Sequence, residues 1–175
     1  RTHPLNAPPH RYGAVLRGDQ SNLYVGGSTN IGDRTVVLTS SVNPTGFSAR
    51  TYIGDWVSIG QGCVLRSCTV DNFATVGDGC VIQEGALVEE RALLEAGSVL
   101  AAGMRVPTGE VYGGNPAVFV RKVGPDEMQD LEDKATAISS LATEHADEFI
   151  PYGTNYQLRE QMEGAAAREK TKETK

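Results

Sequence analysis

Aliphatic residues recur at every sixth position through much of this chain, and that period restricts its fold more than any other feature. The longest run keeps strict register through Val70, Val76, Ile82, Val88 and Leu94. Shorter runs before it contain Val25, Ile31, Ile53, Ile59 and Leu65. The step from Leu65 to Val70 is five residues, so the register slips once at that point. A six-residue repeat is typical of a parallel β-helix.

Small side chains mark a second position of the repeat, four residues after most of the aliphatic ones. They are Thr29, Thr35, Val57, Cys63, Ala74, Cys80, Ala86, Ala92 and Ser98. Three hexapeptides, about 18 residues, make one triangular coil with a short strand on each face. Both positions point inward, and a large side chain at the second would overfill the narrow prism. The two cysteines among them are therefore interpreted as small core residues. Chance spacing in a β-sandwich is the alternative, which so long a run disfavours.

The corners of the prism need residues of their own. Glycine or an acidic residue often follows the aliphatic position, as at Gly32, Gly60, Asp71, Gly77 and Glu95. We expect Gly and Asn to serve corners where the backbone takes a positive φ. Residues 38–52 break the period and predict a loop that leaves one corner, because Pro44 and Gly46 favour turns.

Four segments follow from these patterns. The β-helix is predicted over residues 11–123. A helix is predicted over residues 124–150, because Pro125 suits a first helical position and apolar residues then recur at helical spacing. Residues 1–10 form a proline-rich arm, and residues 151–175 form a polar tail.

Composition excludes several classes of function. The chain has 16 Lys and Arg against 22 Asp and Glu, a net charge of −6, so it would repel phosphate and is a poor candidate for nucleic-acid binding. It contains no run of 18 or more apolar residues, so no membrane-spanning segment is predicted. Three cysteines do not make a disulfide framework and indicate a reducing compartment.

Histidine is nearly absent, and its distribution carries the main functional evidence. The chain has only His3, His10 and His145, with none between residues 11 and 144. His3 and His10 lie in the arm without a third ligand, and His145 fits a helix-packing role. The predicted coils therefore offer no imidazole as a metal ligand or general base.

Four segments resemble γ-class carbonic anhydrases. They are LRGD (Leu16–Asp19), NIGD (Asn30–Asp33), IGDWVSIGQGCVLRSCTV (Ile53–Val70) and PTGEVYGGNPAVFVRKV (Pro107–Val123). The two long segments are specific, whereas hexapeptide acyltransferases share pieces like the short ones. The particular similarity is to the mitochondrial γ-carbonic-anhydrase subunits attached to respiratory complex I in plants, algae and some protists. It extends over roughly residues 11–150.

This resemblance implies a fold, an assembly and a metal. Members of the family are left-handed β-helices that associate as trimers, with a C-terminal helix along the prism. Active members hold zinc at the subunit interface with three histidines, two from one chain and one from its neighbour. The open fourth position binds a water whose pKa the zinc lowers, which gives hydroxide to attack carbon dioxide.

The same resemblance places the three zinc-ligand positions on Leu38, Gln61 and Arg66. The family pattern IGxxVxxGHxxxLHGC reads IGDWVSIGQGCVLRSC in this chain. Leucine has no donor atom, glutamine offers a neutral amide, and arginine carries a fixed positive charge. We therefore predict no catalytic, cofactor-binding or metal site in this chain, with zinc possible only at an interface between partner subunits.

Three charged residues and one aromatic residue complete the candidates. Arg17 and Asp19 resemble a pair that links neighbouring subunits by a salt bridge, and Asp33 resembles a residue that orients the site in active members. We predict that these three residues lie at a trimer interface. Trp56 follows Ile53 by three residues, at an outward-facing turn, and an exposed tryptophan there indicates a protein contact.

The resemblance and the missing ligands together predict a structural role. The chain is expected to be a catalytically inactive subunit of a heterotrimer with paralogous γ-carbonic-anhydrase subunits. Its expected place is the matrix side of the mitochondrial inner membrane, on the membrane arm of complex I, with a role in assembly or stability. Two alternatives stay open, a hexapeptide-repeat acyltransferase and a module that binds bicarbonate or another anion through Arg66 and Arg17.

Overall fold

The computed structural model describes residues 12–46 and 48–148 of the chain. The predicted arm over residues 1–10 and the predicted tail over residues 151–175 lie outside the described residues. The chain divides into two compact units after Ser140, and the β-helix belongs wholly to the first. Within the described residues, no helix combines the length and the apolar character that crossing a bilayer requires.

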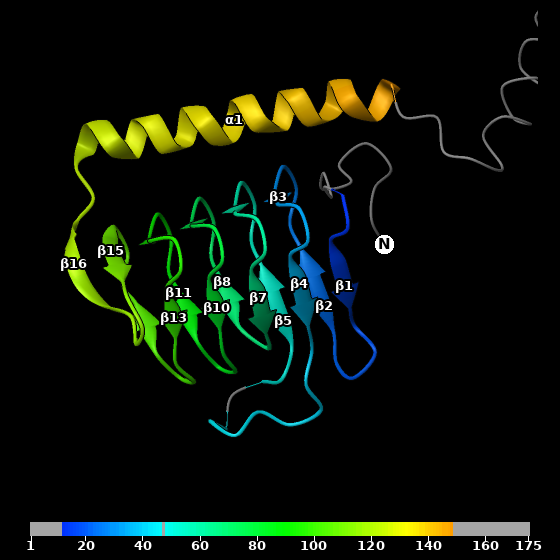
Figure 1. Ribbon diagram of the computed structural model, residues 1–175, viewed down its shortest axis with the longest axis vertical. Helices are drawn as coiled ribbons and strands as arrows, with labels where there is room; N and C mark the ends of the chain where they lie inside the picture. Colours follow the sequence, from blue (N-terminus) through cyan, green and yellow to red (C-terminus); the bar gives the residue numbers. More distant parts are fainter. Residues whose placement is uncertain (1–11, 47, 149–175) are drawn as a thin grey trace, which may run out of the picture. The chain divides into compact units, whose positions relative to one another are not determined.

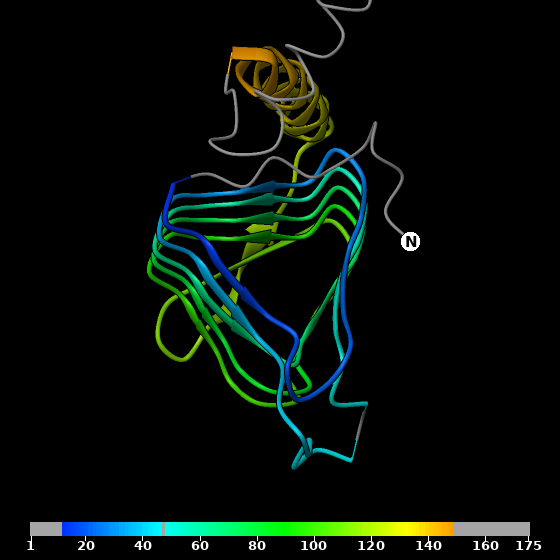
Figure 2. The same ribbon diagram turned by 90° about the vertical axis from the view of Figure 1, so that its right-hand side faces the viewer.

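Three stacks of short strands form the faces of the β-helix (Figures 1 and 2). Face A contains β3 (Asn30–Ile31), β6 (Ser58–Ile59), β9 (Thr75–Val76), β12 (Leu93–Leu94), β15 (Glu110–Gly113) and β16 (Val118–Lys122). Face B contains β1 (Val15–Arg17), β4 (Val36–Leu38), β7 (Val64–Arg66), β10 (Val81–Ile82) and β13 (Val99–Leu100). Face C contains β2 (Leu23–Val25), β5 (Thr51–Ile53), β8 (Thr69–Val70), β11 (Leu87–Val88) and β14 (Arg105–Val106).

Every pairing between successive coils is parallel, and only β16 returns antiparallel to β15. On face A, Ile31 pairs with Ile59, which pairs with Val76, and all three side chains are buried. The small side chains of the second repeat position are buried as well, from Thr29 to Ser98. The sequence prediction of two inward positions per hexapeptide is therefore confirmed. The burial of these apolar columns supplies the main favourable term for folding.

Glycine is required at the corners for two different reasons, and only the first, a positive φ, was expected from the sequence. Gly79 has a φ of +66°, and a Cβ there would meet no heavy atom within 4 Å, so its role is conformational. Gly77 has no positive φ. Instead, a Cβ there would lie 2.5 Å from the backbone nitrogen of Ala96 in the next coil. The glycine directly after the aliphatic residue thus allows two backbones to approach closely.

The predicted loop is shorter than residues 38–52. Leu38 ends β4 and β5 begins at Thr51, so these ends belong to strands and the loop covers residues 39–50. Ser67, buried with a φ of +41°, holds both ends of the loop. Its hydroxyl accepts from the Ser40 backbone N–H at 2.7 Å and donates to the Ala49 carbonyl at 2.8 Å. The register slip and the loop are therefore coupled, because the corner that the slip shortens, at Ser67, bonds both ends of the loop inserted at the same corner of the preceding coil.

Helix α1 (Pro125–Glu148) begins one residue after the predicted start. Asp126 and Glu127 lie in its first turn, where carboxylates complement the helix dipole. Glu127 accepts two hydrogen bonds from the Arg121 guanidinium, at 2.5 and 2.8 Å, which ties the helix start to β16.

Candidate functional site

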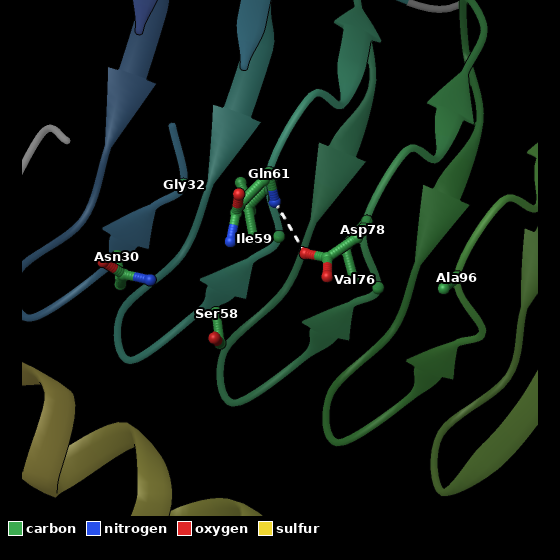
Figure 3. Close-up of a pocket in the computed structure, with 10 residues that line it drawn as sticks. Asn30, Gly32, Ser58, Ile59, Gln61, Val76, Asp78 and Ala96 are labelled. Carbon is green, nitrogen blue, oxygen red and sulfur yellow. Dashed lines mark hydrogen bonds between the residues drawn. The ribbon is translucent and has the colours of Figure 1, made fainter. Parts of the chain in front are cut away.

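A groove of about 390 Å³ lies at the corner where face A leads into face B (Figure 3). It is lined by Asn30, Gly32, Ser58, Ile59, Gly60, Gln61, Val76, Gly77, Asp78 and Ala96. Three of the ten lining residues are glycines at the close-approach position, so backbone forms part of the lining. The carboxylate of Asp78 accepts the backbone N–H of Gln61 at 2.8 Å and so fixes the turn between two coils. We call this the groove corner.

The inside of the groove corner carries a column of hydroxyl and thiol groups. Its members, one per coil, are Thr35, Cys63, Cys80 and Ser98, all buried. Each donates to a carbonyl of the corner, and the Cys63 thiol reaches the Gly77 oxygen at 3.1 Å. The interaction between the two neighbouring thiols lowers the pKa of Cys80 to about 7 and raises the pKa of Cys63.

Sequence reasoning missed this thiol pair, although a signal was present. Cys63 and Cys80 occupy the same repeat position and are separated by one coil, shortened by the slip at Ser67. They are therefore stacked neighbours rather than independent core residues.

Two of the three predicted ligand positions lie side by side on face B. Arg17, Leu38 and Arg66 occupy one register column across β1, β4 and β7. The Arg66 guanidinium lies 3.4 Å from the carboxylate of Glu84, whose side chain is only 19% exposed. The position that would hold the third histidine of an active member is thus filled by a cation that already has an anionic partner.

Gln61 lies apart from the other two positions. It precedes β7 at the groove corner, whereas Arg66 ends β7 at the opposite corner of face B. A single chain therefore does not bring Gln61 together with Leu38 and Arg66.

These residues do not fit a zinc ion. Leu38 supplies no donor, Gln61 supplies at most an amide, and Arg66 would repel a cation. Among the described residues, no three His, Cys, Asp or Glu side chains gather as a metal site. Gly32 adds no donor side chain, and a Cβ there would lie 2.5 Å from the Gly60 carbonyl carbon.

The other predicted site residues have partners within the chain. Arg17 bonds Asp19 at 2.5 Å, and this bond lowers the pKa of the Asp19 carboxyl, although both side chains are exposed. Asp33 accepts the backbone N–H of Tyr12 at 3.0 Å and so fastens the start of the first coil. Their placement at a trimer interface stays a prediction. His3 and His10 lie outside the described residues, as does the side chain of His145.

Trp56 is half-buried, which corrects the expectation of an exposed tryptophan. Its ring stacks on Phe73, with centroids 6.3 Å apart and planes 2° apart. The Arg91 guanidinium lies 5.4 Å from the Phe73 centroid, and its Nε donates to Glu132 of α1 at 2.8 Å. We call this stack, at the corner where face C leads into face A, the ladder corner. The protein contact that the sequence indicated for Trp56 stays a prediction.

The fold and its repeat define a class, the left-handed parallel β-helix of hexapeptide repeats. A solved structure supports this: a hexapeptide transferase family protein from Anaplasma phagocytophilum is 40% identical and superposes with a TM-score of 0.70, over 77% of this chain and 75% of that one. No family model matches the sequence.

Curated relatives narrow the class. A probable carbonic anhydrase of Methanocaldococcus jannaschii is 42% identical over 75% of this chain and 79% of that protein. The mitochondrial gamma carbonic anhydrase-like 2 of Arabidopsis thaliana is 47% identical over 82% of this chain and 56% of that protein. The chain belongs to the γ-class carbonic anhydrase family. It spans about half the length of the mitochondrial relatives it matches.

Proposed function

We propose that this chain is a catalytically inactive, structural member of the γ-carbonic-anhydrase family. It would act as one subunit of a trimer with ligand-bearing paralogues, on the matrix side of mitochondrial complex I. The observation that carries the proposal is a regular β-helix whose three predicted ligand positions are Leu38, Gln61 and Arg66, with Arg66 paired to Glu84. The mitochondrial names of the relatives support the compartment.

The separation of the three positions fits a site divided between chains. Leu38 and Arg66 would form one half and Gln61 the other half, at opposite corners of face B. In a mixed trimer, this chain would then remove zinc from both interfaces that it forms. Only the interface between the other two subunits would keep its metal, so the trimer would hold at most one zinc.

Metal analysis of the purified chain and of the mixed trimer tests the inactivity. We expect no stoichiometric zinc in the chain alone and no more than one zinc per mixed trimer. The matched controls are two variants. Leu38→His/Gln61→His/Arg66→His restores all three imidazoles, and Leu38→His/Gln61→His keeps Arg66. Stoichiometric zinc or carbon dioxide hydration in the unaltered chain would overturn the proposal.

A native gel of gently solubilised mitochondrial membranes tests the assembly. We expect the chain to migrate with complex I together with paralogues that carry the three histidines. A separate species of ~56 kDa, the mass of three copies of this chain, would instead indicate a free homotrimer and contradict the assignment.

An anion-binding role is the second candidate, because Arg17 and Arg66 share one column of face B. Each guanidinium already bonds a carboxylate, which weakens this candidate. Titration calorimetry with bicarbonate, compared between the unaltered chain and Arg66→Gln, distinguishes it. An acyltransferase role has less support, since residues 11–144 contain no histidine as a general base, and an acyl-CoA turnover assay tests it.

A further inference from the structure

We propose that Cys63 and Cys80 are an oxidation-sensitive thiol pair that closes into a disulfide between two successive coils. This inference is independent of the proposed function, because it needs no metal and no partner chain. It rests on the placement of the two thiols, on their surroundings and on the groove beside them.

Backbone hydrogen bonds fix the two cysteines as direct neighbours. On one side of the pair, the Gly79 N–H donates to the Gln61 carbonyl at 2.7 Å, and on the other the Val64 N–H donates to the Cys80 carbonyl at 2.9 Å. Neighbouring strands are about 4.8 Å apart, which lies within the Cα separations of about 4.4–6.8 Å found in disulfides. Both side chains point into the prism, so neither has to turn to the other side of its strand for a bridge to form.

The groove corner offers a small oxidant a route to the pair. Both thiols are buried, but the Cys63 thiol bonds the carbonyl of Gly77, and Gly77 itself lines the groove. Gly60 and Gly77 place no side chain between the groove and the thiols. The backbone that accepts the Cys63 thiol therefore also lines the groove, and transient opening of this corner would expose the pair.

Hydrogen peroxide is the class of oxidant that the step requires. The Cys80 thiolate attacks one peroxide oxygen, the O–O bond breaks, and a sulfenic acid and hydroxide form. The Cys63 sulfur then attacks the Cys80 sulfur and gives up its proton as it does so, the S–O bond breaks, and a second hydroxide leaves. The two thiol protons convert the hydroxides to two waters, so two electrons pass from the two sulfurs to one peroxide. The depressed pKa of Cys80 favours it as the attacking sulfur.

Cys68 provides the internal control. It is buried at a different corner, burial raises its pKa to about 12, and its neighbour in the next coil is Ala86 rather than a thiol. It is therefore expected to stay reduced under the same treatment.

Peptide mapping of the full chain tests the inference. Reduced, folded chain is treated with hydrogen peroxide, remaining thiols are alkylated in denaturant, and the digest is analysed by mass spectrometry. We expect a Cys63–Cys80 linked peptide, alkylated Cys68, and a Tm higher by on the order of 5–10 °C. Cys68→Ser should keep both effects, and Cys63→Ser or Cys80→Ser should lose both.

Serine is the appropriate substitution, because Thr35 and Ser98 already place hydroxyls at this repeat position. Circular dichroism verifies that each variant is folded. If a serine variant does not fold, the linked peptide and the Tm shift of Cys68→Ser decide alone. Three free thiols after peroxide treatment, a link that includes Cys68, a link between two chains, or a link formed only in urea would each overturn the inference.

Discussion

Two corners of the same β-helix mostly place different kinds of residue at the position of the turn that takes a positive φ. At the groove corner, the positive φ is taken by Arg34 in the first coil and by Gly62, Gly79 and Gly97 in the following coils. At the ladder corner, the equivalent residues are Trp56, Phe73 and Arg91, with φ values of 58°, 56° and 55°. Bulky residues are unfavourable in this left-handed conformation by roughly 1–2 kcal/mol each.

The difference shows what each corner does with its outer surface. The ladder corner offsets the cost of its backbone by stacking successive side chains and by connecting them to Glu132 of α1. Beyond the first coil, the groove corner has glycine at the positive-φ position, and Gly60 and Gly77 line the groove. Repetition of one hexapeptide thus produces a surface filled by its own side chains and a surface left open.

Among the variants that compare the two corners, Gly77→Ala should cause the largest loss of stability. Its Cβ would lie 2.5 Å from the Ala96 nitrogen and 2.8 Å from the Ala96 Cα, which are backbone atoms that cannot move independently. We expect a loss of about 3 kcal/mol in the free energy of unfolding. The matched control is Gly79→Ala, where nothing lies within 4 Å and the φ of +66° alone should cost about 1 kcal/mol.

Urea denaturation of the two variants measures the difference. Equal losses for Gly77→Ala and Gly79→Ala would show that the close approach of coils is not what requires glycine at the groove corner.

At Phe73, the usual order of stability between an alanine variant and a glycine variant should be reversed. Phe73→Ala removes both stacking contacts but keeps the positive φ, and we expect a loss of about 2 kcal/mol. Phe73→Gly also removes the contacts but relieves the backbone, so it should be more stable than Phe73→Ala by about 0.5–1 kcal/mol.

Thr75 in β9, which has no positive φ, is the control for that reversal. There, the glycine variant should be the less stable of the two, as in ordinary strands. Chemical denaturation followed by the fluorescence of Trp56, the single tryptophan, reports on both sites. Phe73→Gly falling below Phe73→Ala would contradict a strained ladder corner.

Arg91→Ala should have a smaller effect. It removes the cation–π contact with Phe73 and the bond to Glu132, and we expect a loss of about 1 kcal/mol. Arg34→Ala is the control, because Arg34 also has a positive φ of 57° but forms no ion pair among the described residues. The excess loss for Arg91→Ala should shrink at high salt. An excess that salt leaves unchanged would assign the effect to packing instead.

The repeat made the coils and their core predictable from the sequence. A period of six with a small residue four places later fixes which side chains point inward, as Ile59 and Cys63 illustrate. What the period cannot give is contact between coils, since a column depends on how many residues each coil contains. The slip before Val70 therefore concealed both the thiol pair and the position of Ser67 against the loop.

Outward residues were less predictable for a related reason. Trp56 has the same place in its hexapeptide as Gly62, so spacing alone did not reveal that Phe73 lies beside it. The candidate site shows the same limit. The family pattern identified the positions of the candidate site in the sequence. The bond from Arg66 to Glu84 depends on the shortened coil and appears only in the structure.

Asp71 should give the smallest and most pH-dependent effect. It directly follows Val70 at the ladder corner, where the groove corner has Gly77 after Val76. Burial, together with the nearby charges of Glu89 and Glu90, raises the pKa of its carboxyl above the usual 3.8. The folded chain then binds this proton more tightly than the unfolded chain, so the contribution of Asp71 to stability decreases as the pH rises through 3.8 and the raised value. Asp71→Asn, which removes the charge, should increase the Tm slightly at pH 7 and leave it unchanged near pH 3, as measured by thermal denaturation at both values. A Tm that falls at pH 7 would instead mean that the ionised carboxylate stabilises the ladder corner.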